Sequence, residues 1–302
     1  MRALVSKTYA PLDQIEIIEL PDPVAGPGQL VVRVRAAALN PLDVKMVNGT
    51  LRETFPVKHP FVLGYEAAGT VEEVGEGVAD FAEGDEIVAF SFAAIAERIV
   101  VNAGLSVVHR PPGVDAIHAA ALPVAGVMAA QLRDAARLGS GDRLLIVGAT
   151  GGIGVYLMQL ASQRGVEVWA TARPDETDFV LAFGAQHVVD YTHGDIAAQV
   201  DGMDVVIDLI NVGAEIPSAA LRDGGRIVSP LGAWGEYTYD RGITATYERI
   251  VPDADRLRGL LEAVESGKLT VPISGTSAFD DSVKATNDFF GSHTRGKHVI
   301  TF

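Results

Sequence analysis

Apolar and polar residues alternate along the first third of the chain, as expected for strands with one buried face. Leu30, Val32 and Val34 fall on one side of an extended segment, and the arginines between and after them fall on the other. The alternation recurs over residues 69–78 and 83–90, with glycines at the turn positions between them. Short strands at this spacing predict a compact, barrel-like β domain.

The middle of the chain changes to a regular succession of strands and helices. Residues 116–138 are alanine-rich and helical in period, and Pro123 kinks this segment or divides it in two. Five apolar runs without alternation then follow, each beside a helical segment, at residues 143–147, 166–170, 187–191, 204–210 and 226–229. Such runs suit parallel strands covered on both faces, and their repetition predicts a doubly wound α/β sheet.

The last fifty residues combine helices with one short strand. Residues 253–267 place Leu257, Leu260 and Leu261 on one side of an amphipathic helix. A second helix is expected over residues 280–290, and a strand over 298–302.

Composition narrows the classes of function. A length of 302 residues with 48% hydrophobic residues favours two domains with sizeable cores. The formal charge of -15 argues against a general nucleic-acid or anionic-membrane binder. The most apolar stretch, residues 119–132, is too short to span a bilayer. We therefore expect a cytoplasmic protein with neither a membrane nor a nucleic-acid partner.

A glycine-rich turn carries the strongest chemical signal. An apolar strand, residues 144–147, runs into a turn in which Ala149, Gly151 and Gly154 hold the three positions of a G-x-G-x-x-G dinucleotide fingerprint. Gly151 would admit a pyrophosphate close to the backbone, and Gly154 would let helix and strand pack tightly. The amides at the helix start, from Thr150 through Gly152 and Ile153, would then face the phosphates.

The end of the next strand indicates which dinucleotide binds. An NAD site places Asp or Glu there, but this strand ends in Thr171, Ala172 and Arg173. The Arg173 guanidinium suits the 2′-phosphate of NADPH, although a solvated surface arginine is the alternative. We expect Thr171 and Arg173 to contact the cofactor.

Several other chemistries are excluded by missing motifs. There is no phosphate-binding G-x-x-x-x-G-K-[ST] loop, no tyrosine four residues before any lysine, no H-E-x-x-H and no G-x-S-x-G. The chain has no cysteine, so a thiolate zinc site and a cysteine nucleophile are excluded as well.

Short stretches in consistent order along almost the whole chain resemble the medium-chain dehydrogenase/reductase superfamily, in its zinc-independent quinone oxidoreductase branch. They read N-P-L-D (40–43), L-G-Y-E-A-A-G (63–69), G-D (84–85), A-A-L-P-V-A-G (120–126), the glycine turn (148–154), V-D-Y (189–191), D-V-V-I-D (204–208), G-G-R (224–226) and G-K (296–297). The resemblance implies a GroES-like catalytic domain from residues 1–115 and 270–302, a Rossmann cofactor domain from 116–269, and a homodimer.

The resemblance also implies hydride transfer from NADPH to a quinone or an α,β-unsaturated carbonyl without a metal. Zinc-dependent relatives carry Gly-His-Glu where this chain has Gly64-Tyr65-Glu66. A conjugated acceptor needs no Lewis acid, because hydrogen-bond donors can stabilise the developing enolate. Two alternatives remain: an NADPH-binding sensor or structural protein with little turnover, and an enoyl reductase of polyketide or fatty-acid metabolism.

Residue by residue, the resemblance implies roles for two catalytic candidates. Asn40 would lie near the nicotinamide ribose, and Tyr65, in the vacated metal-ligand position, would donate its hydroxyl to the substrate oxygen. Tyr191 would lie at the adenosine phosphate end, where Glu176 replaces a lysine of some relatives. The residues expected to line the nicotinamide are Val124, Leu209, Asn211, Leu231 and Gly232. Loops 50–58 and 234–247 would supply further substrate contacts that the sequence leaves unassigned.

Overall fold

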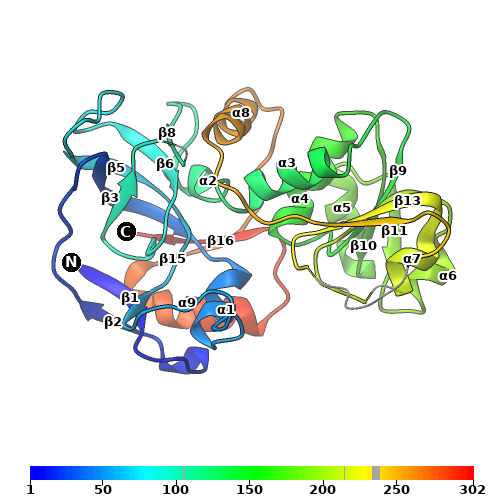
Figure 1. Ribbon diagram of the computed structural model, residues 1–302, viewed down its shortest axis with the longest axis horizontal. Coiled ribbons are helices and arrows are strands. Elements are labelled where there is room, and N and C mark those ends of the chain that lie inside the picture. The colour runs from blue at the N-terminus through cyan, green and yellow to red at the C-terminus, as the bar shows by residue number, and fades with distance from the viewer. Residues whose placement is uncertain (105, 214, 233–238) are drawn as a thin grey trace. The chain divides into compact units, whose positions relative to one another are not determined.

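The computed structural model describes residues 1–302 except 105, 214 and 233–238. The chain forms two compact units, one from Met1–Val124 with Pro252–Phe302, and the other from Ala125–Val251. In Figure 1 the two ends of the chain, coloured blue to cyan and orange to red, make up the first unit, and the green to yellow middle makes up the second.

These unit limits differ from the boundaries expected at 115/116 and 269/270. Helices α2 (Ala116–Ala120) and α8 (Ala254–Glu265) belong to the first unit. The reason is tertiary packing: α2 contacts β3 and β5, and α8 contacts β8. The Gly113 amide also donates to Glu265 Oε1 at 3.1 Å, which ties α8 to the same unit.

The first unit is built from two sheets. In the larger sheet the C-terminal strand β16 pairs antiparallel with β3, with Val299 opposite Ala38, so the end of the chain completes the N-terminal β unit. The smaller sheet has the order β2-β1-β4 and the larger the order β15-β16-β3-β5-β6-β8, with β7 also paired to β3. The strands are β1 (Arg2–Ser6), β2 (Glu16–Glu19), β3 (Gln29–Ala38), β4 (Phe61–Val62), β5 (Glu66–Val74), β6 (Glu86–Phe90), β7 (Arg98–Asn102), β8 (Val107–His109), β15 (Ile273–Ala278) and β16 (Lys297–Thr301). The helices besides α2 and α8 are η1 (Leu12–Gln14), α1 (Pro41–Val47), η3 (Phe279–Asp281) and α9 (Ser282–Gly291).

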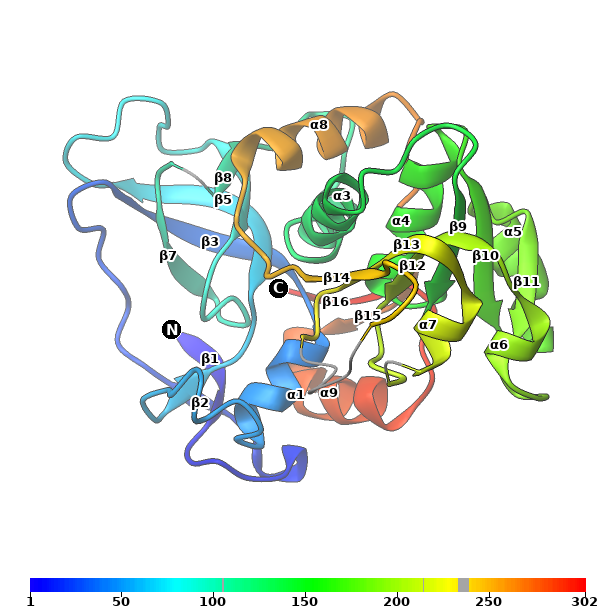
Figure 2. The same cartoon turned by 45° about the vertical axis from the view of Figure 1, so that its right-hand side comes forward.

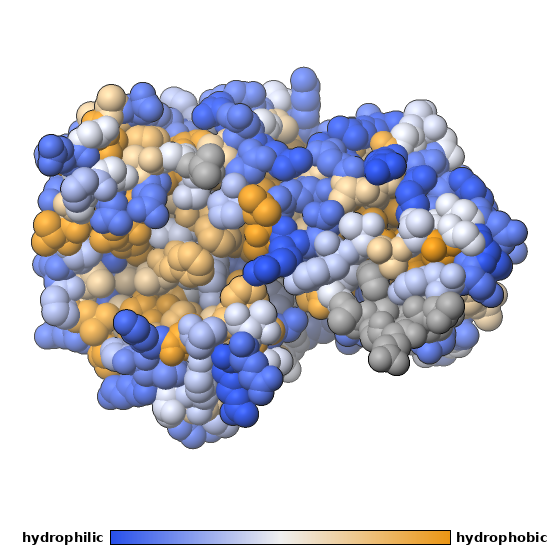
Figure 3. Space-filling model, in the orientation of Figure 1, coloured by the Kyte–Doolittle hydropathy of each residue, from blue (hydrophilic) through white to orange (hydrophobic). Residues whose placement is uncertain are grey.

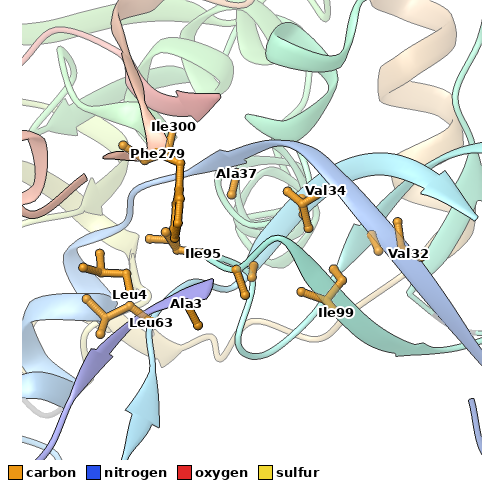
Figure 4. Packing of buried hydrophobic residues seen from close by; sticks show 14 of the residues in the cluster. Ala3, Leu4, Val32, Val34, Ala37, Leu63, Ile95, Ile99, Phe279 and Ile300 are labelled. Atoms are coloured by element: carbon orange, nitrogen blue, oxygen red, sulfur yellow. The ribbon is translucent and has the colours of Figure 1, made fainter. Parts of the chain in front are cut away.

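The alternation predicted for β3 is confirmed, because its apolar side chains point into a buried cluster while Arg33 and Arg35 are exposed. Figure 4 shows part of this cluster, in which side chains from distant parts of the chain pack together. They include Leu4, Val32, Val34, Leu63, Ile95, Ile99, Phe279 and Ile300.

The second unit is the predicted doubly wound sheet. Its six strands are all parallel and follow the spatial order β11-β10-β9-β12-β13-β14 (Figure 2). Numbered within the unit, this is the Rossmann order 3-2-1-4-5-6, in which ligands bind where the order reverses, between the first and fourth strands. The strands are β9 (Arg143–Val147), β10 (Glu167–Ala172), β11 (His187–Asp190), β12 (Met203–Asp208), β13 (Leu221–Ser229) and β14 (Thr244–Tyr247). The helices are α3 (Ala125–Ala135), α4 (Gly152–Ser162), η2 (Pro174–Glu176), α5 (Thr177–Ala182), α6 (Ile196–Gln199) and α7 (Glu215–Ala220).

Two local predictions are refined by the structure. Pro123 divides the alanine-rich segment, since α2 ends at Ala120 and α3 begins at Ala125. Strand β12 ends at Asp208 rather than at residue 210, because the Asp208 carboxylate captures the amides that would continue the strand.

No helix among the described residues combines the length and the apolar character needed to cross a membrane. On the face shown in Figure 3, hydrophilic residues are interspersed with smaller apolar areas. Some large apolar side chains are exposed, such as Phe92 and Ile210. A surface of this kind needs no special explanation except where such a side chain lies beside polar groups of a candidate site.

Candidate cofactor and substrate site

The glycine turn lies at the carboxyl end of β9, at the point where the strand order reverses. Gly148 has a φ of +86°, a left-handed conformation that favours glycine, and its amide donates to Thr171 Oγ1 at 3.0 Å. The Thr171 side chain is buried and braces the turn from the neighbouring strand, while its contact with the cofactor stays a prediction. Ala149 and Thr150 are also buried, whereas residues 151–153 are half-exposed.

Gly154 is required by packing. A Cβ at this position would lie 2.4 Å from the Ala149 carbonyl oxygen and 2.6 Å from its carbonyl carbon, closer than real Cβ contacts come. Because both atoms are backbone, the turn could relieve this overlap only by moving the main chain. Helix α4 therefore lies against the turn that follows β9, too close for a side chain at position 154.

Among the described residues, neither packing nor backbone conformation requires a glycine at position 151. Its φ of -75° and ψ of 172° are open to any residue, and the nearest described atom to an added Cβ would be the Gly148 oxygen at 3.6 Å, an ordinary contact. As the N-cap of α4 it also offers no side-chain hydrogen bond to the first helical amides. A glycine that no described neighbour requires, at the start of a helix whose first amides have no partner within the helix, fits a bound phosphate group.

The turn after β12 is held by one buried carboxylate. Asp208 Oδ1 accepts the amides of Ile210 at 3.0 Å and Asn211 at 2.8 Å, and Oδ2 accepts that of Val212 at 3.0 Å. Asn211 takes a left-handed φ of +63° in this turn. The Ile210 side chain is 59% exposed, and an added Cβ on Gly148 would lie only 2.8 Å from it.

Ile210 was missed by the sequence reasoning, which named its neighbours Leu209 and Asn211. An exposed apolar side chain over the glycine turn suits contact with a flat ring. The other candidates at this sheet edge are Leu231, which is partly exposed, and Gly232, which lies against the Tyr247 ring. Loop 234–247 falls partly outside the described residues, and loop 50–58 is mostly exposed.

Arg173 and Tyr191, predicted separately, contact each other. They follow the adjacent strands β10 and β11, where Ala172 stands opposite Asp190, and Arg173 Nε donates to the Tyr191 hydroxyl at 2.9 Å. The Arg173 amide donates to the buried Glu176 carboxylate at 3.0 Å. Tyr191 therefore orients the guanidinium through Nε, and the two terminal nitrogens form a fork suited to a phosphate.

In the first unit, Asn40 is part of a buried polar cluster. Asn40, Glu66 and Lys297 are 3%, 0% and 2% exposed. Lys297 Nζ donates to Glu66 Oε1 and to Asn40 Oδ1, each at 2.7 Å. Asn40 Nδ2 donates to Glu66 Oε1 at 2.9 Å and to the Ala38 oxygen at 3.2 Å. Both amide hydrogens of Asn40 are thus used internally, and only its oxygen has capacity left for a ligand.

Glu66 and Lys297 were not predicted as site residues, although both occur in the family-like stretches. The second oxygen of Glu66 accepts the Val124 amide at 2.7 Å. Val124, a predicted cofactor contact, is therefore anchored to the same carboxylate as Asn40.

Asp43 and Tyr65 lie beside this cluster. Asp43 accepts the amides of Asn40 and Gly64, each at 2.8 Å, and complete burial raises its pKa to about 7. Burial, with the negative charge of Asp43, also raises the pKa of Tyr65, so its hydroxyl keeps its proton at neutral pH. The Tyr65 side chain is 2% exposed, and no described residue hydrogen-bonds its hydroxyl. An unpaired buried hydroxyl costs about 1–3 kcal/mol, so a functional reason is expected.

Comparisons with known proteins agree with this geometry. Residues 26–129 match the alcohol dehydrogenase GroES-like domain, and residues 183–300 match the zinc-binding dehydrogenase family. A quinone-oxidoreductase homolog from Spinacia oleracea chloroplasts is 32% identical over 94% of this chain and 92% of its own length. The chain belongs to the medium-chain dehydrogenase/reductase superfamily, in its quinone oxidoreductase branch.

Further members of the superfamily are similar over nearly the whole chain. An NADPH-dependent alkenal/one oxidoreductase from Arabidopsis thaliana chloroplasts is 30% identical, covering 99% of this chain and 79% of the relative. The quinone oxidoreductase structure from Coxiella burnetii has a TM-score of 0.92 at 28% identity and covers 100% of this chain and 99% of its own. A mycobacterial structure complexed with NADPH has a TM-score of 0.88 at 25% identity, with 100% of both chains covered.

The zinc site named in one matching family does not fit this chain. The sequence has no cysteine, and Tyr65 stands where zinc-dependent members of the superfamily have histidine. Within the described part of the chain, no three His, Asp or Glu side chains gather as metal ligands. We therefore derive no step through a metal.

Proposed function

We propose that this protein is an NADPH-dependent oxidoreductase that transfers a hydride to a quinone or another α,β-unsaturated carbonyl compound. The observation that carries the proposal is Gly151, a glycine that neither its backbone conformation nor any described neighbour requires, at the start of α4 in a Rossmann sheet. The names of the spinach and Arabidopsis relatives support the acceptor class.

The cofactor-holding residues are assigned from these positions. The amides of Gly152 and Ile153 at the start of α4 hold the pyrophosphate, and the fork of Arg173, oriented by Tyr191, holds the 2′-phosphate. Bound NADPH supplies the hydride that reduces the substrate. The proposed nicotinamide contacts are Val124, Leu209, Ile210, Asn211, Leu231 and Gly232.

Two side chains of the first unit serve the reaction. Hydride addition at the β-carbon of an enone moves negative charge to the carbonyl oxygen. A proton from Tyr65 or from water then converts the resulting enolate to the saturated ketone. The protonated Tyr65 hydroxyl, to which no described residue is hydrogen-bonded, donates a hydrogen bond to that oxygen. Asn40, whose hydrogens are used internally, accepts a hydrogen bond from a ribose hydroxyl through Oδ1.

An acceptor screen tests the proposal. Purified protein is mixed with NADPH and a panel of 1,4-quinones, alkenals and enones, and oxidation is followed at 340 nm, where NADPH absorbs. We expect turnover with several acceptors and a preference for NADPH over NADH. Binding of NADPH without turnover of any acceptor would contradict the reductase and favour the sensor. Turnover confined to thioester-linked enoyl groups would favour the enoyl reductase.

We further propose a homodimer that extends the Rossmann sheet. Among the described strands β14 lies at the edge of the sheet, and all four of its residues are exposed. An exposed edge strand offers unpaired backbone groups to a second copy related by a two-fold axis. Light scattering should give twice the chain mass of 31.8 kDa, and Tyr247→Lys should shift it toward the monomer. Val24→Lys, at an exposed position of the first unit, is the matched control, and a monomeric wild type would contradict the dimer.

A further inference from the structure

Three segments far apart in the sequence converge on the carboxylate of Glu66. Its Oε1 receives Lys297 Nζ from the start of β16 and Asn40 Nδ2 from the residue preceding α1. Its Oε2 receives the amide of Val124, the last residue before the second unit begins. All four residues belong to the first unit, and the carboxylate has no exposed surface.

We infer that Glu66 and Lys297 are positioning residues, which hold the Asn40 amide and the Val124 backbone in the single arrangement that receives the nicotinamide end of the cofactor. This inference rests on the proposed function, because it assigns Asn40 and Val124 to the cofactor. It adds two residues that touch neither cofactor nor substrate and act through those that do.

The charges of the pair determine which way the Asn40 amide points. Lys297 donates to Asn40 Oδ1, and Glu66 accepts from Asn40 Nδ2. A flipped amide would set its NH2 group against the ammonium and its oxygen against the carboxylate, so both contacts would become repulsive. The amide therefore presents only an acceptor to a ligand, and the ligand group that matches it is a hydroxyl such as that of a ribose.

The ammonium group itself is held without freedom. Its third hydrogen bond goes to the Leu39 carbonyl oxygen at 2.9 Å, so all three donors are used. The backbone at the start of β16 is fixed as well: the Lys297 amide donates to the Pro272 oxygen at 3.0 Å. Gly296 has a φ of +81°, and a Cβ there would lie 2.4 Å from the same oxygen.

Stability alone does not account for such a pair. Taking two charges out of water costs several kcal/mol per ion, and well-packed neutral residues in place of a buried ion pair are often as stable. A buried ion pair orients a neighbouring polar group through its hydrogen bonds, and an apolar pair cannot. The pair is thus expected to matter more for turnover than for folding.

The experiment replaces both charges together, because either change alone leaves an unpaired buried group. Glu66→Gln/Lys297→Met is compared with the wild type and with Lys284→Met/Asp288→Asn, which removes an exposed ion pair of α9 in the same unit. Melting temperature, NADPH affinity, kcat and KM are measured with NADPH and with NADH. For the buried double variant we expect kcat/KM to fall by about tenfold to a hundredfold, the scale on which small misplacements act.

Two readouts separate positioning from a merely structural role. The loss should be equal with NADPH and NADH, because the 2′-phosphate lies at the other end of the cofactor. Asn40→Leu alone should lower the kcat/KM of the wild type. Added to the double variant, the same change should lower kcat/KM almost no further, because the amide has already lost its orientation. Should the double variant not fold, the isosteric Glu66→Gln variant is tested in the same way, with a smaller loss expected.

The outcomes are distinct. A folded Glu66→Gln/Lys297→Met variant with wild-type kcat/KM overturns the inference. So does a double variant in which Asn40→Leu lowers kcat/KM by as much as it does in the wild type. If only Glu66→Gln folds, unchanged kcat/KM in that variant also overturns it. A wild type that neither binds nor oxidises NADPH overturns the proposed function instead.

Discussion

Replacing Gly151 separates the requirements of the fold from those of a ligand. Its backbone conformation is open to any residue, and an added Cβ would make one ordinary contact with the described part of the chain, at 3.6 Å. Alanine is a poorer N-cap than glycine by up to about 1 kcal/mol, but it also stiffens the unfolded chain by a similar amount. The free energy of unfolding of Gly151→Ala should therefore stay within about 1 kcal/mol of the wild type.

Gly154→Ala gives the opposite expectation three residues later. Its Cβ would overlap the Ala149 backbone at 2.4 Å, and overpacking of this kind costs about 1–3 kcal/mol. A gain in helix propensity of about 1 kcal/mol offsets part of that cost. Gly259→Ala, in the middle of α8 with nothing within 4 Å of its Cβ, isolates the propensity gain and serves as the matched control.

The assays are urea unfolding followed by circular dichroism, and isothermal titration with NADPH and with NADH. Gly151→Ala, and more strongly Gly151→Val, should lose affinity for both cofactors at nearly unchanged stability, because the added side chain occupies the space of the pyrophosphate. Gly154→Ala should lose stability, and Gly259→Ala should lose neither stability nor affinity.

The result that refutes this reasoning is Gly151→Val with wild-type affinity for both cofactors. The glycine would then have no role toward a diphosphate, and the assignment of this turn to a dinucleotide would be lost. A large loss of stability in Gly151→Ala would show instead that the turn has an internal requirement for glycine.

Three further predictions concern single side chains. Arg173→Ala should raise KM for NADPH by the equivalent of about 1.5–3 kcal/mol and leave KM for NADH unchanged, as steady-state kinetics would show; equal effects on both cofactors would contradict the 2′-phosphate role. Tyr65→Phe removes a hydroxyl that has no hydrogen-bond partner in the described part of the chain, so urea unfolding should find the variant at least as stable as the wild type while kcat with enones falls; unchanged kcat would exclude the hydroxyl as the donor. Burial raises the pKa of Asp43 from 3.8 to about 7, so the protonated carboxyl stabilises the fold below pH 4. This contribution to the free energy of unfolding, up to about 4 kcal/mol, is lost as the pH rises through 7. Unfolding of Asp43→Asn at pH 4.5, 6 and 8 should show a shallower decline, and a parallel curve would place the titration elsewhere.

The sequence by itself determined the features that depend on short stretches of chain. The alternation in β3, the unbroken apolar runs of the parallel sheet and the glycine turn after β9 were predicted from spacing alone. This succeeds because the side-chain period of a strand and the backbone freedom of glycine are local properties. The role of Arg173 at a 2′-phosphate was predicted from its position at the end of β10 and stays a prediction.

Only the tertiary structure decided which distant residues meet. Asn40, Glu66 and Lys297 lie on three strands or strand ends whose adjacency follows from the order β16-β3-β5, which no local pattern encodes. The same holds for the contact of Arg173 with Tyr191 across two parallel strands, and for α8, whose amphipathic pattern did not reveal the unit it packs against. Local periodicity fixes which face of an element is apolar, whereas the partner of that face depends on sheet order and register, which the folded chain sets as a whole.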